Sequence, residues 1–449
     1  MLRMFFRRIR PGQLIVLVFL GIILFGAGLL CLPAAARSGR PTPFLTSLFT
    51  ATSATCVTGL IRVDTGTHWT MFGQVVILLL IQVGGLGFMT IACLFFFALR
   101  RKIGLRQRMV IAQALGSDTY SGIVSLVRNI LRGTAAVEGV GALILFFRFL
   151  PEFGFGRALW YGVFHSVSAF CNAGFDVLAD VDAGGSLCRY ATDPVVNFTI
   201  MALIIIGGLG FAVWGDIRHH RRFSRLSVYS RLVVIITTVL IFGGAGVFAA
   251  LEWNNPNTIG DLTVPQKLMA ALFQSVTLRT AGFATFDQNA LSDVSKAASD
   301  LLMLVGGSSG STAGGVKTAT VGVILLSAWS TARGRTSVHV MKRRIPRQAV
   351  ENASALFILV LLLSGLGAAF LSIADHVSLE NALYETISAL CTVGLTTGIT
   401  SSLGTASQII LIVLMFFGRL GIMTISVGFM AANRAEERVS YAETKIMIG

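Results

Sequence analysis

Four short segments of this 449-residue chain end in a glycine that uncharged residues flank, a combination suited to binding a metal cation through main-chain oxygens. Three of them share the pattern Ser-Ala-x-Cys-x-x-Gly, and each glycine follows an aromatic residue by ten positions. The third segment in chain order also has an aromatic residue before its glycine, but the distance between them is one residue shorter. The glycines are Gly59, Gly174, Gly282 and Gly394, at separations of 115, 108 and 112 residues. This regular spacing predicts one supersecondary unit used four times.

The chemistry that these segments favour is the capture of a dehydrated monovalent cation. Glycine adopts backbone angles that other residues avoid, so it allows carbonyl groups to turn toward a common axis. Rings of carbonyl oxygens replace the water shell of potassium in known filters, and Thr392-Val393-Gly394 matches the start of such a filter motif. No carboxylate lies among these residues, which disfavours a pore for divalent cations. The predicted potassium-binding residues are Cys56, Val57, Thr58, Gly59, Cys171, Asn172, Ala173, Gly174, Thr280, Ala281, Gly282, Thr392, Val393 and Gly394. The alternative is that the glycines only terminate short interfacial helices.

A second set of residues predicts a gate. Five glycines and four hydroxyl residues between positions 306 and 315 cannot hold a straight lipid-facing helix, so we expect a broken helix with a flexible loop under the filter. A phosphate-binding loop is excluded because Val316 separates Gly315 from Lys317. The alternative is a passive kink. The predicted gate residues are Gly306, Gly307, Ser308, Ser309, Gly310, Ser311, Thr312, Ala313, Gly314, Gly315, Lys317 and Arg419.

Three ionisable side chains fall within apolar stretches, where such residues are functional by default. A potassium ion about 5 Å from Arg419 would feel about 3 kcal/mol of repulsion at an effective dielectric constant near 20. Arg419 is therefore interpreted as a barrier, with a structural anchor to main-chain carbonyls as the alternative. Lys317 either donates to the broken helix or lies along a cytoplasmic cavity. Glu138 is expected to pair with Arg132, and a coupling-ion site is its alternative.

The elements that must position these residues are membrane spans. Apolar residues make up 54% of the chain, charged residues 13%, and the mean hydropathy is +0.77, so we expect a polytopic membrane protein. The first apolar stretch also resembles a cleavable secretion signal, but we interpret it as the opening span of the first repeat. Eight spans are predicted, within residues 11–36, 65–99, 133–147, 194–215, 232–251, 301–331, 352–374 and 401–433.

The distribution of charge sets the predicted topology. The formal charge is +15, and 20 of the 36 Lys and Arg residues fall in four windows, residues 3–10, 100–108, 218–231 and 333–347. These windows follow every second span, as cytoplasmic loops do under the positive-inside rule. We therefore predict hairpins with both termini cytoplasmic. Because the charge lies in loops, a nucleic-acid partner is not expected.

The predicted fold is an all-α polytopic membrane protein. Four parallel repeats, each a span, pore helix, loop and span, surround a central pore in pseudo-fourfold symmetry. The second span of each repeat also contains a repeated motif. It reads Gly-Gly-Leu-Gly-Phe at 84–88 and 207–211, with degenerate copies at 306–310 and 418–422. Close helix packing through small residues accounts for the first two copies. The predicted repeat boundaries are 1–108, 109–228, 229–346 with the broken second span, and 347–449 with a C-terminal tail.

Over essentially its whole length the chain resembles the potassium-translocating subunit of bacterial Ktr uptake systems, within the Trk/Ktr/HKT superfamily. The resemblance rests on Thr55–Leu60, Phe170–Phe175, Arg279–Phe283, Gln82–Phe88 and Phe417–Gly421. It implies potassium uptake across the bacterial plasma membrane, an intramembrane gating loop, a homodimer and a cytosolic ring of nucleotide-binding RCK domains as regulator. Cysteines 56, 171 and 391 depart from the Thr, Asn or Gly expected there, which affects side-chain contributions at the inner end of the filter.

Other function classes fit the sequence less well. No Ser/His/Asp or Cys/His arrangement and no nucleotide motif is found, so we expect neither an enzyme nor a cofactor, with potassium as the substrate. A sodium- or proton-coupled secondary transporter remains the alternative, although it predicts ionisable residues at the midplane and inverted repeats. A membrane scaffold would leave the four loops unexplained. The basic loops, notably 333–347, could receive the regulatory ring, satisfy topology or bind anionic lipid.

Overall fold

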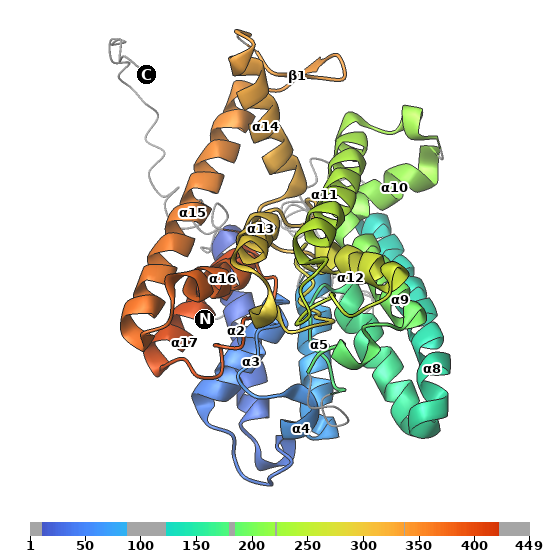
Figure 1. The fold of residues 1–449 in the computed structure, drawn as a ribbon, viewed down its shortest axis with the longest axis vertical. Coiled ribbons are helices and arrows are strands. Elements are labelled where there is room, and N and C mark those ends of the chain that lie inside the picture. The colour runs from blue at the N-terminus through green and yellow to red at the C-terminus, as the bar shows by residue number, and fades with distance from the viewer. Residues whose placement is uncertain (1–10, 88–122, 179–184, 221, 336, 422–449) are drawn as a thin grey trace, which may run out of the picture.

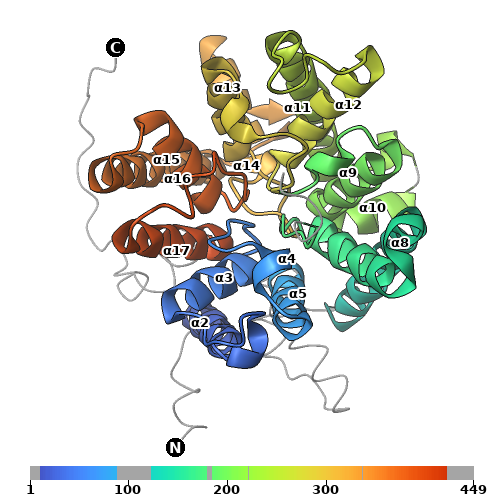
Figure 2. The same ribbon diagram turned by 60° about the horizontal axis from the view of Figure 1, so that its bottom comes forward.

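The computed structural model describes residues 11–87, 123–178, 185–220, 222–335 and 337–421. Their helices form four groups around a common centre, in chain order, as Figure 2 shows. The N-terminus, the basic windows 3–10 and 100–108, and the C-terminal tail lie outside the described residues. The other two basic windows lie at the same end of the molecule, opposite α4 (Figure 1).

Each group contains a long outer helix, a short buried helix that points to the centre, and a returning helix. The first contains α2 (Pro11–Leu30), η1 (Pro33–Ala35), α3 (Phe44–Cys56), α4 (Thr65–His68) and α5 (Met71–Leu86). The second contains α8 (Ile123–Phe170), η2 (Cys188–Tyr190), α9 (Pro194–Leu209), α10 (Phe211–His220) and η3 (Phe223–Arg225). The third contains α11 (Val228–Glu252), α12 (Val264–Thr277), η4 (Gln288–Ala290), α13 (Asp293–Leu304), α14 (Thr318–Ala332), β1 (His339–Val340) and β2 (Arg343–Arg344). The fourth contains α15 (Arg347–Asp375), α16 (Leu379–Leu390) and α17 (Thr405–Leu420).

The helices match the predicted spans in place but not always in length. Three of the described helices are long and apolar enough to cross a membrane, and α9 with α10 forms a fourth candidate bent by 93°. Four shorter apolar helices, at 15–30, 71–86, 318–332 and 405–420, occupy the other predicted spans. The count of eight spans therefore stays a prediction. Large apolar side chains such as Phe25, Phe242 and Leu366 are exposed on the outer helices, as expected for a surface that contacts lipid.

In the second group the short helix is the C-terminal part of α8. This 48-residue element contains Pro151 and a non-helical glycine, Gly154, at φ 71° and ψ 173°. The proline removes a backbone donor and the glycine turns the chain, so the outer part and the short part are separate helices joined at a bend. The predicted boundary at 228/229 falls at the first residue of α11, and the boundary at 346/347 falls at the first residue of α15.

Candidate functional site

Four loops that follow the short helices meet at the centre of the molecule. We call them glycine loops 1 to 4, residues 56–59, 171–174, 279–282 and 391–394. Each contains two left-handed positions, the glycine itself and the residue two places before it. The glycines have φ values of 98°, 68°, 82° and 94°, and the preceding residues Val57, Asn172, Thr280 and Thr392 have values of 56°, 59°, 65° and 53°. A left-handed non-glycine residue costs about 1–2 kcal/mol, so the surroundings must impose this backbone in all four loops.

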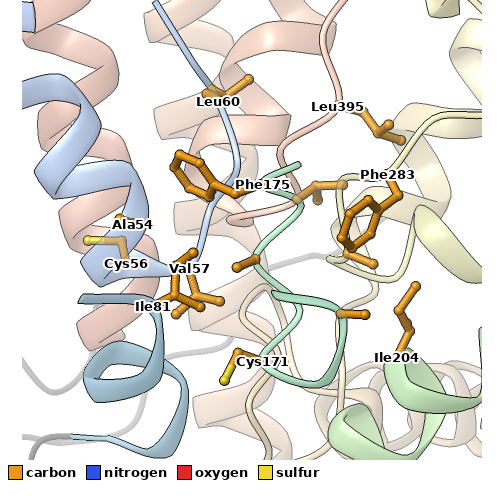
Figure 3. Close-up of a cluster of buried hydrophobic side chains, with 14 of the residues drawn as sticks. Ala54, Cys56, Val57, Leu60, Ile81, Cys171, Phe175, Ile204, Phe283 and Leu395 are labelled. Carbon is orange, nitrogen blue, oxygen red and sulfur yellow. The ribbon is translucent and has the colours of Figure 1, made fainter. Parts of the chain in front are cut away.

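The loops touch one another in cyclic order. A Cβ atom built on Gly59 would lie 2.6 Å from the carbonyl oxygen of Ala173, and one on Gly174 would lie 2.7 Å from that of Ala281. One on Gly282 would lie 2.6 Å from the oxygen of Val393, and one on Gly394 would overlap the oxygen of Thr58. Each loop therefore packs its glycine against a main-chain oxygen of the next, and loop 4 packs on loop 1. The residues after the glycines, Leu60, Phe175, Phe283 and Leu395, are buried around this ring (Figure 3).

Hydrogen bonds to the short helices hold the loops in this shape. In each loop the residue before the glycine donates its N–H to a carbonyl in the last turns of the helix, at 2.8 to 2.9 Å. The hydroxyl group of the residue that carries this carbonyl binds either the loop glycine or the residue directly after it. Ser53 and Ser388 accept from Gly59 and Gly394 at 3.1 and 3.0 Å. Ser168 and Thr277 donate to the carbonyls of Phe175 and Phe283 at 2.7 and 2.6 Å.

These four hydroxyl residues are part of the site, a role that the sequence analysis did not assign, although three of them are the serine of its Ser-Ala-x-Cys-x-x-Gly pattern. Three of them precede the loop glycine by six positions and the fourth, in the shorter copy, by five. This constant position was a usable signal. A buried loop without secondary structure must satisfy its polar backbone groups locally, and a serine or threonine in the preceding helix does so.

The repeated glycines of the returning helices pack on the short helices. Gly84, Gly207 and Gly418 each lie against the carbonyl of the residue four places before the loop glycine of their own group. A side chain there would overlap that carbonyl, so the close approach requires glycine. This geometry agrees with the predicted packing role. The same helices end at Gly87, Gly210 and Gly421, which have φ values of 77°, 90° and 80°.

The third group differs at this level, because α13 ends at Leu304 and α14 begins only at Thr318. The residues between them form the 305–317 loop, which contains the predicted gate. Val305 and Val316 form an isolated parallel bridge, and the N–H of Gly306 donates to the Val316 carbonyl at 2.9 Å. The N–H of Thr318 donates to the Gly307 carbonyl at 3.0 Å. We call this closed base, residues 305–307 and 316–318, the neck of the loop.

Beyond the neck, the loop lies against two of the glycine loops and against α9. The hydroxyl group of Thr312 lies 2.9 Å from the carbonyl oxygen of Phe170, the last residue of α8, and 3.3 Å from the side-chain oxygen of Asn172 in glycine loop 2. The N–H group of Thr312 donates to the Gly207 carbonyl at 3.3 Å. Ser308 donates to the carbonyls of Gly208 and Leu209. A Cβ atom on Gly314 would meet the side chain of Thr392 and, at 3.0 Å, the carbonyl of Cys391. The predicted gate residues are thus in direct contact with the inner ends of glycine loops 2 and 4.

The two cations among the predicted gate residues donate to carbonyls of this loop. Arg419, at the end of α17, donates to the Thr312 carbonyl at 2.5 Å and to the carbonyls of Gly84 and Gly85 in α5. It therefore joins the first, third and fourth groups. Lys317 donates to the carbonyls of Ala313 and Gly314 at 2.8 and 3.5 Å, which is the first of its two predicted placements. The anchor geometry considered for Arg419 is present, and a barrier role is compatible with it.

The predicted pairing of Glu138 with Arg132 is wrong. The Glu138 carboxylate accepts from the side-chain amide of Gln82 in α5 at 3.1 and 3.2 Å, and the Cys171 thiol lies 3.9 Å from it. Among the ion pairs formed by described residues, none joins Glu138 to Arg132. The two residues are six positions apart, which does not place them on the same face of one helix. Gln82 comes from another repeat, so sequence proximity gave no sign of it.

Comparisons with known proteins find a matching family model, relatives of similar sequence and a structure of similar fold. A family model described as Cation transport protein, TrkH, matches residues 22–438. The chain is 40% identical over 448 residues to the potassium/sodium uptake protein NtpJ of Enterococcus hirae, covering 99% of this chain and 98% of that protein. It is 39% identical over 442 residues to the Ktr system potassium uptake protein B of Bacillus subtilis, covering 98% and 97%. Its fold is similar to the crystal structure of the potassium transporter TrkH from Vibrio parahaemolyticus, with a TM-score of 0.74 at 17% identity, over 93% of this chain and 84% of that one.

Proposed function

Because the chain belongs to the TrkH family of cation transport proteins, we propose that it carries potassium ions into the cell through the ring of four glycine loops. The observation that carries this proposal is the cyclic contact of the four glycines with the carbonyl of the next loop. A closed ring of main-chain oxygens suits a dehydrated monovalent cation, because carbonyl groups replace its water without a fixed negative charge. The two relatives described above are named for potassium uptake, which agrees with this chemistry.

The 305–317 loop is proposed as the gate. It contacts the inner ends of two glycine loops, and its tip is held by hydrogen bonds that can be exchanged for others. Arg419 is proposed to do two things, to anchor the loop through Thr312 and to raise the barrier for a passing cation. Uptake would follow the membrane potential, which supplies about 2.3 kcal/mol per elementary charge per 100 mV.

Regulation and assembly are part of the same proposal. We propose a homodimer in the bacterial plasma membrane, with both termini cytoplasmic and the four predicted repeats around one pore in each chain. A cytosolic RCK-type ring would dock on the basic end that contains α10, β1 and β2, and membrane lipids would contact the exposed apolar side chains. The name of one relative, a component of a Ktr system, supports the presence of a partner.

Ion flux into proteoliposomes tests this proposal. Purified protein is reconstituted with potassium inside, and uptake of ⁸⁶Rb⁺ is measured with external potassium, sodium or no competitor. Potassium should compete strongly and sodium weakly, without any imposed sodium or proton gradient. Uptake that requires such a gradient would instead favour the secondary transporter, and absence of uptake in protein that is shown to be folded would contradict the proposal. Sodium is included because one relative is named for both ions.

A further inference from the structure

One position in the glycine loops breaks the repeat. The residue three places before the glycine is cysteine in loops 1, 2 and 4, namely Cys56, Cys171 and Cys391. In loop 3 it is Arg279. The group that carries this arginine is also the one whose returning helix is interrupted by a long loop. The two departures from the repeat therefore occur in the same group, and the structure shows how they are connected.

Arg279 hydrogen-bonds both ends of the 305–317 loop. Its guanidinium donates from Nη2 to the carbonyl of Gly306 at 3.3 Å and to the hydroxyl of Thr318 at 3.2 Å. The Thr318 hydroxyl in turn donates to the same Gly306 carbonyl at 2.9 Å. Gly306 enters the loop and Thr318 leaves it, so a single nitrogen atom joins the two strands of the neck. The side chain is only 7% exposed, which keeps water from replacing these bonds.

Arg279 has no acidic partner among the described residues. Among the ion pairs of the described residues none includes it, and its Nε atom is buried without a hydrogen-bond partner there. It lines a small cavity with Gly307 and Gly208, and the remaining lining residues are Ile204, Ile205, Ile241 and Val276. A buried cation without a carboxylate is costly, so its interactions with the neck must offset part of its lost hydration.

Comparison with the other groups shows what the arginine replaces. Gly84, Gly207 and Gly418 attach their returning helices directly to a short-helix carbonyl. Gly306 holds the equivalent position in the sequence repeat, but a Cβ atom on it would meet Gly314 of its own loop. The third group thus lacks the glycine contact between the returning helix and the short helix. The Arg279 side chain, which extends from the end of α12 to the neck, supplies a connection at this level.

We propose that Arg279 is the positioning residue that fixes the base of the gate, so that the tip of the 305–317 loop moves while its neck stays attached to glycine loop 3. Arg419 holds the opposite end, because its acceptor in the loop is Thr312 at the tip. Opening then breaks the contacts of Thr312 and Ser308 but keeps those of Gly306 and Thr318. This inference rests on the proposed function of the loop as a gate.

The proposal predicts that loss of either partner at the neck has the same consequence. Arg279→Gln and Thr318→Val should each increase hydrogen–deuterium exchange across residues 306–318, by about tenfold to hundredfold, since a hydrogen bond to a charged group contributes about 1.5–3 kcal/mol. Both should raise ⁸⁶Rb⁺ uptake in the absence of any regulatory partner and leave competition by sodium unchanged. Arg279→Lys should restore part of the protection. In the double variant the loss of protection should be smaller than the sum of the two single effects, because the Arg279–Thr318 bond is already lost in each single variant.

The matched control is Thr320→Val, two residues further along α14, whose hydroxyl makes no hydrogen bond with the described residues. It should change neither exchange nor flux. Increased uptake in Arg279→Gln with wild-type behaviour of Thr318→Val would overturn the proposal in favour of a purely electrostatic effect, and so would unchanged exchange in both. If Arg279→Gln does not fold, the milder Thr318→Val decides. Exchange does not depend on transport, so absent uptake by the wild type contradicts the proposed function without deciding this inference.

Discussion

The ring of glycine loops and the layer of returning helices next to it follow the same repeat to different degrees. In the ring, all four loops have two left-handed positions, the same bond to the preceding helix and the same contact with the next loop. In the layer of returning helices, three groups pack a glycine on a carbonyl and the third has a loop instead. The proposed contact with one ion from all sides uses four equivalent loops, whereas the proposed closure of the pathway uses one movable segment. We infer that selection and control are divided between these two layers.

The two layers also differ in their charges. The four loops contribute one charged side chain, and this side chain, Arg279, leaves the ring for the neck of the 305–317 loop. Three cations, Arg279, Lys317 and Arg419, donate to carbonyls of that same loop. Several of its main-chain oxygens therefore accept from protein donors, while in the ring one main-chain oxygen of each loop lies against the glycine of a neighbouring loop. A loop held at its base, middle and tip by separate donors can be released in stages.

The largest effect is expected from a side chain in the ring. Gly394→Ala places a methyl group on the Thr58 carbonyl at a backbone φ of 94°. Left-handed strain of about 1–2 kcal/mol adds to an overpacking penalty of about 1–3 kcal/mol, so selective ⁸⁶Rb⁺ uptake should fall by at least about thirtyfold. The matched control is Gly398→Ala, where φ is 91° but nothing lies within 4 Å of the new Cβ. Equal losses in the two variants would show that backbone strain, and not the ring contact, matters.

Removal of the tip anchor should have the opposite sign. Arg419→Gln loses the bonds to Thr312, Gly84 and Gly85 and also the positive charge. Uptake without a partner should rise by about tenfold to hundredfold, the range set by a barrier of about 3 kcal/mol, with selectivity unchanged. Arg419→Lys keeps the charge but not the paired donors. Uptake near the wild-type rate in this variant would indicate that the charge forms a barrier, and raised uptake would indicate that the hydrogen bonds form an anchor. Reduced sodium discrimination in Arg419→Gln would break the proposed division between the layers.

The sequence was informative about the ring because the ring repeats. Four glycines at nearly equal separations identified four loops before their contacts were known, and the interrupted span at 305–317 followed from its glycines and hydroxyl residues. The partners of single side chains were harder to predict. Gln82 meets Glu138, and Arg279 meets Thr318, across distances of 56 and 39 residues. Such contacts depend on how groups pack together, and no local periodicity encodes them. The length of each span was also missed, since several returning helices stop at a left-handed glycine.

A smaller effect is expected where one neutral hydroxyl group, that of Thr312, joins the two layers through Phe170 and Asn172. Thr312→Val removes the bond from the loop tip to the Phe170 carbonyl, whose net contribution is about 1 kcal/mol, so uptake should rise by about fivefold. Ser311→Ala is the matched control, because the neighbouring hydroxyl is buried without a partner among the described residues. Its flux should equal that of the wild type. If both variants leak equally, general loosening of the loop explains the result better than the specific contact with glycine loop 2.

The smallest effect on transport is expected at the start of α9, at the opposite end of this helix from Gly207. Asp193 caps α9 by accepting from the N–H groups of Val195 and Val196, and it pairs with Arg148 at 2.5 Å. Asp193→Ala should lower stability by about 1–2 kcal/mol, seen as a decrease of a few degrees in Tm, and change neither uptake nor sodium competition. Glu351→Ala, in a pair whose side chains are 90% and 59% exposed, should change nothing. An effect of Asp193→Ala on sodium competition would mean that the geometry of the ring depends on the whole second group of helices. The proposed division of selectivity and gating between the two layers would then be wrong.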